Sequence, residues 1–315
     1  MKKNSYNAVK YLPSCLIFIF FIFIFIYQDE VKNTISFSIS LWKDNLFPSM
    51  YPFLLLSDLL INYDFIDFLA FFLGGIVKKI FNVPRDACYA VIISMLSGFP
   101  SGAKYVNDLL VSEKISISDA NYLIMFTHFP NPLFVVSFVG GYILSCKKIG
   151  YVIFLSIVIS NFIIAFIFRP KTCDSINKSN FKKELTSTKK DFVKSFLTSS
   201  LKSFKILVNM LGIVMFSLIF ATILFNLFDF NIYLKAILSA IVEMTNGIYF
   251  LSSINMELSL KCAFLSLIIS FSGISVHMQV KSIITDTGIK YKNFLLSRII
   301  GSILSFFIVL IYFSF

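Results

Sequence analysis

Apolar segments long enough to cross a bilayer recur along this chain, and they constrain its fold more than any other feature. The most continuous ones cover residues 11–27, 151–168, 206–228 and 294–315. A transmembrane helix needs about 20 predominantly apolar residues, and strands with unpaired edges are not stable in lipid. Hydrophobic residues make up 57% of the chain and charged residues only 14%, against about 25% charged in soluble domains. We therefore predict an all-α polytopic membrane protein.

Positive charges gather in short loops beside these segments. Lys2, Lys3 and Lys10 precede the first apolar segment, and residues 169–205 hold many more lysines than acids. Cytoplasmic loops of membrane proteins carry such an excess. We expect the first segment to be a signal anchor that starts in the cytoplasm, and 169–205 to be a cytoplasmic linker. The bias accounts for the net charge of +11, so we expect membrane lipids as partners and no nucleic acid.

The sequence lacks the residue patterns that several kinds of chemistry require. The five cysteines include no C-x-x-C pair, and the chain has only two histidines, which argues against a disulfide framework and a metal site. Neither G-x-G-x-x-G nor a Walker motif is present, and nothing resembles a hydrolytic triad. We expect no enzyme, no cofactor and no metal.

The segment Leu96–Lys104 breaks an apolar run with two glycines and a proline, and it ends in a charge. Freed backbone groups at membrane depth are tolerated only where they are buried in protein or line a wet cavity. A helix restarting near Ala103 would offer unpaired N–H groups that suit an anion. A surface turn, with Lys104 paired to Asp108 one helical turn on, is the alternative. The substrate-binding candidates here are Gly98, Pro100, Ser101, Gly102 and Lys104.

A second interruption lies at residues 127–132, where two prolines flank an asparagine. A regular helix cannot continue through this sequence, and paired broken helices are typical of transporter sites. The candidates here are Thr127, His128 and Asn131. A plain proline kink is the alternative.

Three polar residues inside apolar flanks are candidates for ion or proton coupling. Glu243 and Asn246 are three residues apart and share a helical face, and Asp58 is a carboxylate within an apolar run. Ionisable residues inside membrane segments are costly and mark function by default. The alternative is that Asp58 lies near the interface and that Glu243 snorkels from a helix end.

A third interruption covers residues 270–279, where polar side chains surround a glycine. Ser272, Ser275 and Gln279 fall on one helical face, and Gly273 and His277 form a neighbouring stripe. All five are substrate-binding candidates. His277 could instead only bond a neighbouring carbonyl.

The order of events in the two halves is similar. Ser97-Gly98 leads through Lys104 to a polar turn, and Ser272-Gly273 leads through Gln279 to another. Such weak internal symmetry is typical of secondary transporters whose site lies between repeats. We predict an anchor and connection at 1–46, a first repeat at 47–168, the linker at 169–205 and a second repeat at 206–315. The repeats are expected to be inverted, with broken or re-entrant helical hairpins.

At these residues the chain resembles the YlbJ (SpoVV) family of sporulation integral membrane proteins, within the nucleoside-recognition or Gate-domain group. The marks are residues 97–104, 131–134 and 273–280. One departure is that the family usually has a Thr-Asn lead into Ser-Asn-Pro, whereas this chain has Thr127-His128 and Pro130-Asn131-Pro132. The resemblance implies a fold similar to that of concentrative nucleoside transporters.

The resemblance also implies a function in spore cortex and core maturation. It implies transport of dipicolinic acid, a dicarboxylate anion, from the mother cell towards the forespore across the outer forespore membrane. A carrier of nucleosides or other small metabolites is one alternative, and a non-transporting scaffold for spore-envelope assembly is another. The expected partners are a small-molecule anion and membrane lipids, with room for a homo-oligomer.

Overall fold

The computed structural model describes residues 5–63, 65–171 and 191–315, and every regular element in these ranges is a helix. Within these described ranges, four helical segments are long and apolar enough to cross a membrane, or five if a bent N-terminal pair counts as one span. The four are α9 (Lys147–Ile167), α10 (Phe192–Leu227), the broken helix Leu258–Ile284, and α15 (Tyr291–Phe313). The predicted all-α membrane fold is therefore confirmed.

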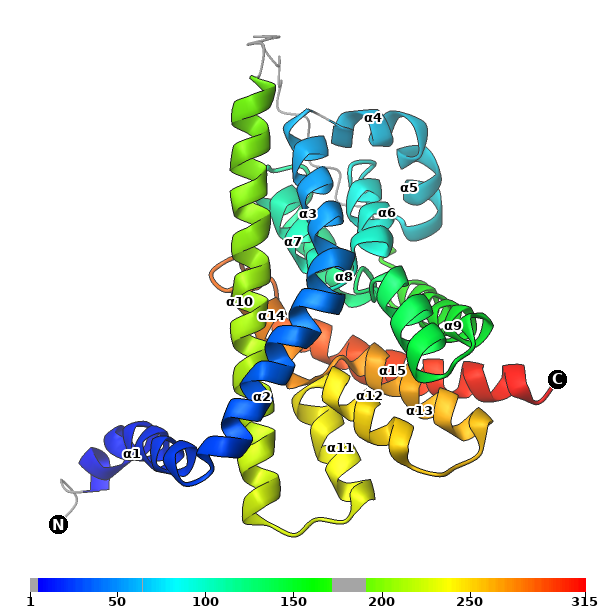
Figure 1. The fold of residues 1–315 in the computed structure, drawn as a ribbon. Helices are drawn as coiled ribbons and strands as arrows, with labels where there is room; N and C mark the ends of the chain where they lie inside the picture. Colours follow the sequence, from blue (N-terminus) through cyan, green and yellow to red (C-terminus); the bar gives the residue numbers. More distant parts are fainter. Residues whose placement is uncertain (1–4, 64, 172–190) are drawn as a thin grey trace.

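The N-terminal helices frame one side of the bundle. They are α1 (Ser5–Ile26), α2 (Gln28–Leu41), the π-helical turn η1 (Trp42–Leu46) and α3 (Phe47–Asn62). The apolar parts of α1 and α2 meet at 95°, and α1 projects away from the other helices (Figure 1). Most large apolar side chains of α1 are exposed, whereas the ring of Phe20 contacts Phe216 of α10 at 5.5 Å. This apolar surface suits lipid.

The first half contains one helical hairpin and one interrupted helix. After α4 (Phe65–Phe72) and α5 (Gly74–Phe81), the hairpin is formed by α6 (Ala87–Ser97) and α7 (Ser101–Val111), which pack on each other. The interrupted helix consists of α8 (Ile117–Phe126) and the π-helical segment η2 (Phe134–Ile143). Helix α6 ends at Gly98, whose φ of +79° few other residues adopt. The two predicted breaks at Leu96–Lys104 and 127–132 are both present.

The second half repeats these two kinds of element. Helices α11 (Ile232–Val242) and α12 (Met244–Ser253) form a hairpin around Glu243. They approach so closely that a Cβ on Gly247 would lie 2.4 Å from Cα of Ala240. Helices α13 (Leu258–Phe271) and α14 (Gly273–Ile284) are separated only at Ser272, which has a left-handed backbone with φ of +76°.

The two hairpins approach the middle of the bundle from opposite ends of α10 (Figure 1). Near the start of α10, Lys202 reaches Asp58 beside the first hairpin. At its other end, α10 runs into the connection that begins the second hairpin. An inverted repeat would place its hairpins in this way, and the repeat relation itself stays a prediction.

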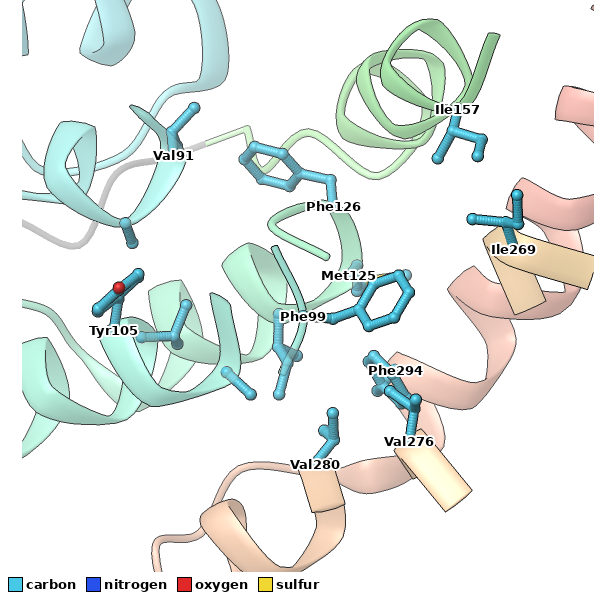
Figure 2. Packing of buried hydrophobic residues seen from close by; sticks show 14 of the residues in the cluster. Val91, Phe99, Tyr105, Met125, Phe126, Ile157, Ile269, Val276, Val280 and Phe294 are labelled. Atoms are coloured by element: carbon cyan, nitrogen blue, oxygen red, sulfur yellow. The ribbon is translucent and has the colours of Figure 1, made fainter. Parts of the chain in front are cut away.

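The core lies where the two halves meet, and Figure 2 shows its packing. Phe99, from the tip of the first hairpin, lies near Met125 of α8, with Val276, Val280 and Phe294 close by (Figure 2). All five are buried. Apolar contacts between halves therefore surround the breaks and exclude lipid from them.

The middle of the predicted linker lies outside the described residues, and its last part, from Phe192, forms the start of α10. Residues 172–190, including Cys173, are not described. Just before them, Asn82 Nδ2 donates to the Pro170 carbonyl at 2.8 Å, and Arg169 Nη2 donates to the Lys79 carbonyl at 2.7 Å. These bonds anchor the end of the first half to α5 and to the residue that ends it, Asn82.

Candidate functional site

In the first half, the hairpin tip lies directly against the interrupted helix. A Cβ on Gly98 would lie 2.6 Å from the Asn131 backbone nitrogen, and one on Gly102 would lie 1.9 Å from the Thr127 carbonyl oxygen. No side chain fits at either distance, so both glycines permit the close backbone approach expected from the sequence.

The Asn131 side chain forms hydrogen bonds on both sides of this contact. Its Oδ1 accepts hydrogen bonds from the backbone N–H groups of Leu133 at 2.9 Å and Phe134 at 3.2 Å, which caps the start of η2. Its Nδ2 donates to the Ser97 carbonyl at 3.4 Å. One amide therefore holds the restart of the interrupted helix beside the end of α6.

Glu243 is the turning point of the second hairpin. Its carboxylate accepts from the Asn246 backbone N–H at 3.0 Å and from the Thr245 hydroxyl, which caps α12. The side chain is 2% exposed, and no Lys, Arg or His pairs with it among the described residues. The glycine of the next break, Gly273, packs against Met244, since a Cβ there would lie 3.1 Å from the Met244 nitrogen.

Residues of three breaks, Phe99, Asn131 and Glu243, border one small cavity, and α14, which follows the fourth break, borders it through Gln279. The cavity volume is about 20 Å³, which is room for one water molecule. Its polar lining is Asn131 from the first half and Glu243, Thr245 and Gln279 from the second. Both amide atoms of Gln279 are buried without a hydrogen-bond partner among the described residues. Buried polar groups are normally paired, so this amide points to a ligand or a water in the cavity.

The apolar part of the cavity lining comes from six elements. These residues are Leu46, Met50, Phe99, Phe134, Met210, Val214, Met244 and Val276.

A larger groove of about 560 Å³ reaches the same place from α2, η2 and α12. It is mostly apolar, with Phe37, Phe138 and Tyr249 among its walls. Phe134 and Thr245 line both the groove and the cavity. These two side chains therefore separate the wide space from the narrow one.

The two histidines do not line the cavity. Nε2 of His128 shares a hydrogen bond with Ser272 Oγ at 3.1 Å, and its ring stacks on Phe99 with centroids 4.7 Å apart. Nε2 of His277 donates to the Phe271 carbonyl at 2.9 Å, and its Nδ1 is 2.8 Å from the Tyr291 hydroxyl. The carbonyl bond considered for His277 from the sequence is thus present. His128, in contrast, joins the breaks of the two halves.

Lys104 lies in a charge cluster away from the cavity. It is 8% exposed, and its Nζ lies 3.2 Å from Asp58 Oδ1 and 3.3 Å from Asp108 Oδ2. Asp58 also accepts from Lys202 at 2.7 Å and from Ser199 at 2.9 Å. The structure therefore unites α3, α7 and α10 through Asp58, and it places Asp58 apart from Glu243.

The remaining candidates fall into three groups. Asn246 donates from Nδ2 to Ser239 Oγ at 3.4 Å, which steadies the second hairpin. The hydroxyls of Ser101 and Ser275 are buried without a partner among the described residues. Thr127 donates to the Leu123 carbonyl, and Pro100 follows a cis peptide bond in the hairpin tip.

Arg298 is the polar residue that the sequence analysis missed. It is fully buried in α15 and donates to the Met125 carbonyl at 2.8 Å and to Asn161 Oδ1 at 2.9 Å. The signal in the sequence was an arginine inside an apolar span, which marks function by default. Among the described residues, no group of three or more His, Cys, Asp or Glu could hold a metal ion.

Comparison with known proteins finds a relative of this chain in Bacillus subtilis (strain 168). It is described as "Sporulation integral membrane protein YlbJ", and the two are 26% identical over 298 residues, which cover 84% of this chain and 73% of that protein. No family model matches the chain, and no solved structure matches it.

Proposed function

Because the chain belongs to the YlbJ family of sporulation integral membrane proteins, we propose that it is a secondary transporter for a small dicarboxylate, dipicolinic acid. It carries this anion from the mother cell towards the forespore across the outer forespore membrane, where it serves cortex and core maturation. Membership of the family supports the place in sporulation.

The observation that carries the transport function is one buried cavity that is bordered by three helix interruptions and by the helix that follows a fourth. Secondary transporters place their sites where broken helices of two halves face each other near the middle of the bilayer. Here Asn131, Glu243 and Gln279 come from such breaks or from the helix that follows one. The buried amide of Gln279 has no partner among the described residues, and buried polar groups are normally hydrogen-bonded. A solute in the cavity would provide this partner, whereas a scaffold that binds no solute would not.

One helix N-terminus near the cavity favours an anion. Helix α14, which borders the cavity, begins at Gly273 without a side-chain cap, whereas the Ser101 and Ala103 N–H groups of α7 already donate to the Gly98 and Pro100 carbonyls. Free N–H groups and the positive end of the helix dipole attract negative charge. The amide of Gln279, two turns into α14, adds a donor that has no other partner among the described residues.

Glu243 would repel an anion unless it carries a proton. An ionised carboxylate without a cationic partner is costly in a buried site, and a proton removes both that cost and the repulsion. Glu243 therefore takes up a proton together with the substrate in this mechanism, and the proton is the coupling ion. The three-residue spacing of Glu243 and Asn246 serves this by letting the backbone of Asn246 hold the carboxylate in place.

A carrier of nucleosides or similar neutral metabolites is the second candidate. It is favoured by the cavity lining, which includes no Lys or Arg side chain among the described residues. Carboxylate and amide groups suit sugar hydroxyls and bases, because together they offer both donors and acceptors.

Uptake by the purified protein in liposomes tests the proposal. Wild-type protein should accumulate dipicolinic acid and not uridine. Gln279→Leu should reduce this uptake about tenfold, the effect of losing one hydrogen bond to a charged group. The matched control Gln28→Leu changes an exposed glutamine of α2 and should transport normally. Uptake of uridine alone would favour the second candidate, and uptake of neither solute would support the scaffold.

A further inference from the structure

A permanently charged side chain is buried at the centre of the molecule without a carboxylate. Arg298 lies within the span α15 and is 0% exposed. No ion pair within 4 Å joins it to an Asp or Glu in the described ranges. An unpaired buried ion is very costly, so other groups must balance this charge.

Backbone carbonyls and one amide provide that balance. Nη2 donates to the Met125 carbonyl at 2.8 Å and to Asn161 Oδ1 at 2.9 Å. Nη1 donates to the His128 carbonyl at 3.3 Å and lies 3.5 Å from the Ser270 carbonyl oxygen. Asn161 is held for this task, because its Nδ2 donates to the His128 carbonyl at 2.8 Å.

These carbonyls belong to the ends of two half-helices. Met125 lies in the last turn of α8, and Ser270 lies in the last turn of α13. The last carbonyls of a helix have no partner within it and carry the negative end of the helix dipole. His128 extends the set into the break that follows α8. The planar fork of arginine suits several such acceptors at once, which a lysine ammonium does not.

Carbonyls at half-helix C-termini and in unwound segments are the groups that coordinate the coupling cation in transporters with broken helices. We propose that Arg298 is a tethered cation that takes this place in the present protein, so that the carrier works without a bound alkali cation. The proposal deepens the function proposed above and rests on it. It leaves the proton at Glu243 as the coupling ion.

The test uses thermal unfolding of the purified protein in detergent, with and without cations. Wild-type protein should melt at the same temperature in sodium chloride and in choline chloride. Arg298→Ala leaves the carbonyls around an arginine-shaped space and should melt lower. Guanidinium chloride at millimolar concentration should then raise its melting temperature by about 3 °C. Such a rescue would show that these carbonyls bind a cation when the arginine is absent.

Arg169→Ala is the matched control, because Arg169 is exposed and donates to a single carbonyl. Guanidinium should leave its melting temperature unchanged. If Arg298→Ala does not fold, Arg298→Lys keeps the charge and should melt independently of sodium, as wild-type protein does.

Three outcomes would overturn the proposal: no rescue of Arg298→Ala, equal rescue of Arg169→Ala, or sodium dependence of wild-type melting or uptake. The unfolding experiments need no substrate. A protein that passes them but takes up no dipicolinic acid would contradict the proposed function alone.

Discussion

The contact between the first hairpin and the interrupted helix predicts a specific cost for adding one methyl group at Gly102. This glycine lies in the first turn of α7, and its backbone is an ordinary helical one. Gly102→Ala therefore causes no backbone strain by itself. The added Cβ would lie 1.9 Å from the Thr127 carbonyl oxygen and 2.9 Å from its carbonyl carbon.

The magnitude follows from this distance. A carbon and a carbonyl oxygen in contact are about 3.3 Å apart, so α7 and the break at Thr127 must separate by roughly 1.4 Å. Overpacking of this kind costs about 1–3 kcal/mol. Alanine also gains about 1 kcal/mol over glycine in a helix, which partly offsets the cost. We expect a net destabilisation of about 1 kcal/mol, a fall of about 2–4 °C in melting temperature.

Two other helical glycines serve as controls. A Cβ on Gly75 of α5 or Gly212 of α10 would meet no atom within 4 Å. Gly75→Ala and Gly212→Ala should therefore be neutral or stabilising by up to about 1 kcal/mol. The assay is thermal unfolding in detergent, with uptake measured at matched protein levels.

The result that would refute this reasoning is a Gly102→Ala protein that melts and transports like the Gly75→Ala protein. The stretch would then be an ordinary turn, and the hairpin tip would not need its close approach. Larger groups should have larger effects, so Gly98→Val and Gly102→Val should abolish transport.

Two further predictions concern buried carboxylates, and a third concerns the topology. Asp58→Asn should destabilise the protein by about 3 kcal/mol, because it removes a buried partner of Lys104. Its control, Asp67→Asn, affects only the half-exposed carboxylate paired with Lys114 and should cost at most about 1 kcal/mol. Equal melting temperatures of the two variants would contradict the role given to Asp58. Wild-type uptake should fall as rising pH removes the coupling proton, and Glu243→Gln should make uptake independent of pH. A pH dependence that persists in this variant would exclude Glu243 as the proton-binding group. Cys173 lies outside the described residues. In a variant that lacks the other cysteines, a membrane-impermeant thiol reagent should not label Cys173 in intact cells, and labelling would contradict the predicted topology.

The breaks in the helices could be predicted because their causes are local. Glycine and proline interrupt a helix wherever they occur in it, and apolar composition alone requires helices in lipid. The interruptions at Gly98, Asn131 and Ser272 therefore followed from short stretches of sequence. The turn at Glu243 was not expected, because Glu243 and Asn246 were placed on one helical face, whereas Glu243 is extended between α11 and α12. The close approach at Gly98 and Gly102 was also expected, because only glycine leaves such space.

The choice of partners could not be predicted, because it depends on which helices lie side by side. Lys104 had a neighbour at Asp108 one turn away, but its second acid, Asp58, belongs to another helix and also binds Lys202 of α10. His128 and His277 were both expected at the site, yet each bonds elsewhere, His128 to Ser272 and His277 to Phe271.

The sequence by itself determined the helical membrane fold and the positions of three interruptions, since hydropathy and backbone restrictions act within a few residues. Only the tertiary structure decided that Asn131, Glu243 and Gln279 face one cavity and that Arg298 caps two half-helices. Arg298, for example, lies more than 100 residues along the chain from its partners Met125 and His128. A buried polar group must find its partner wherever packing brings one, and that choice is made by the whole bundle.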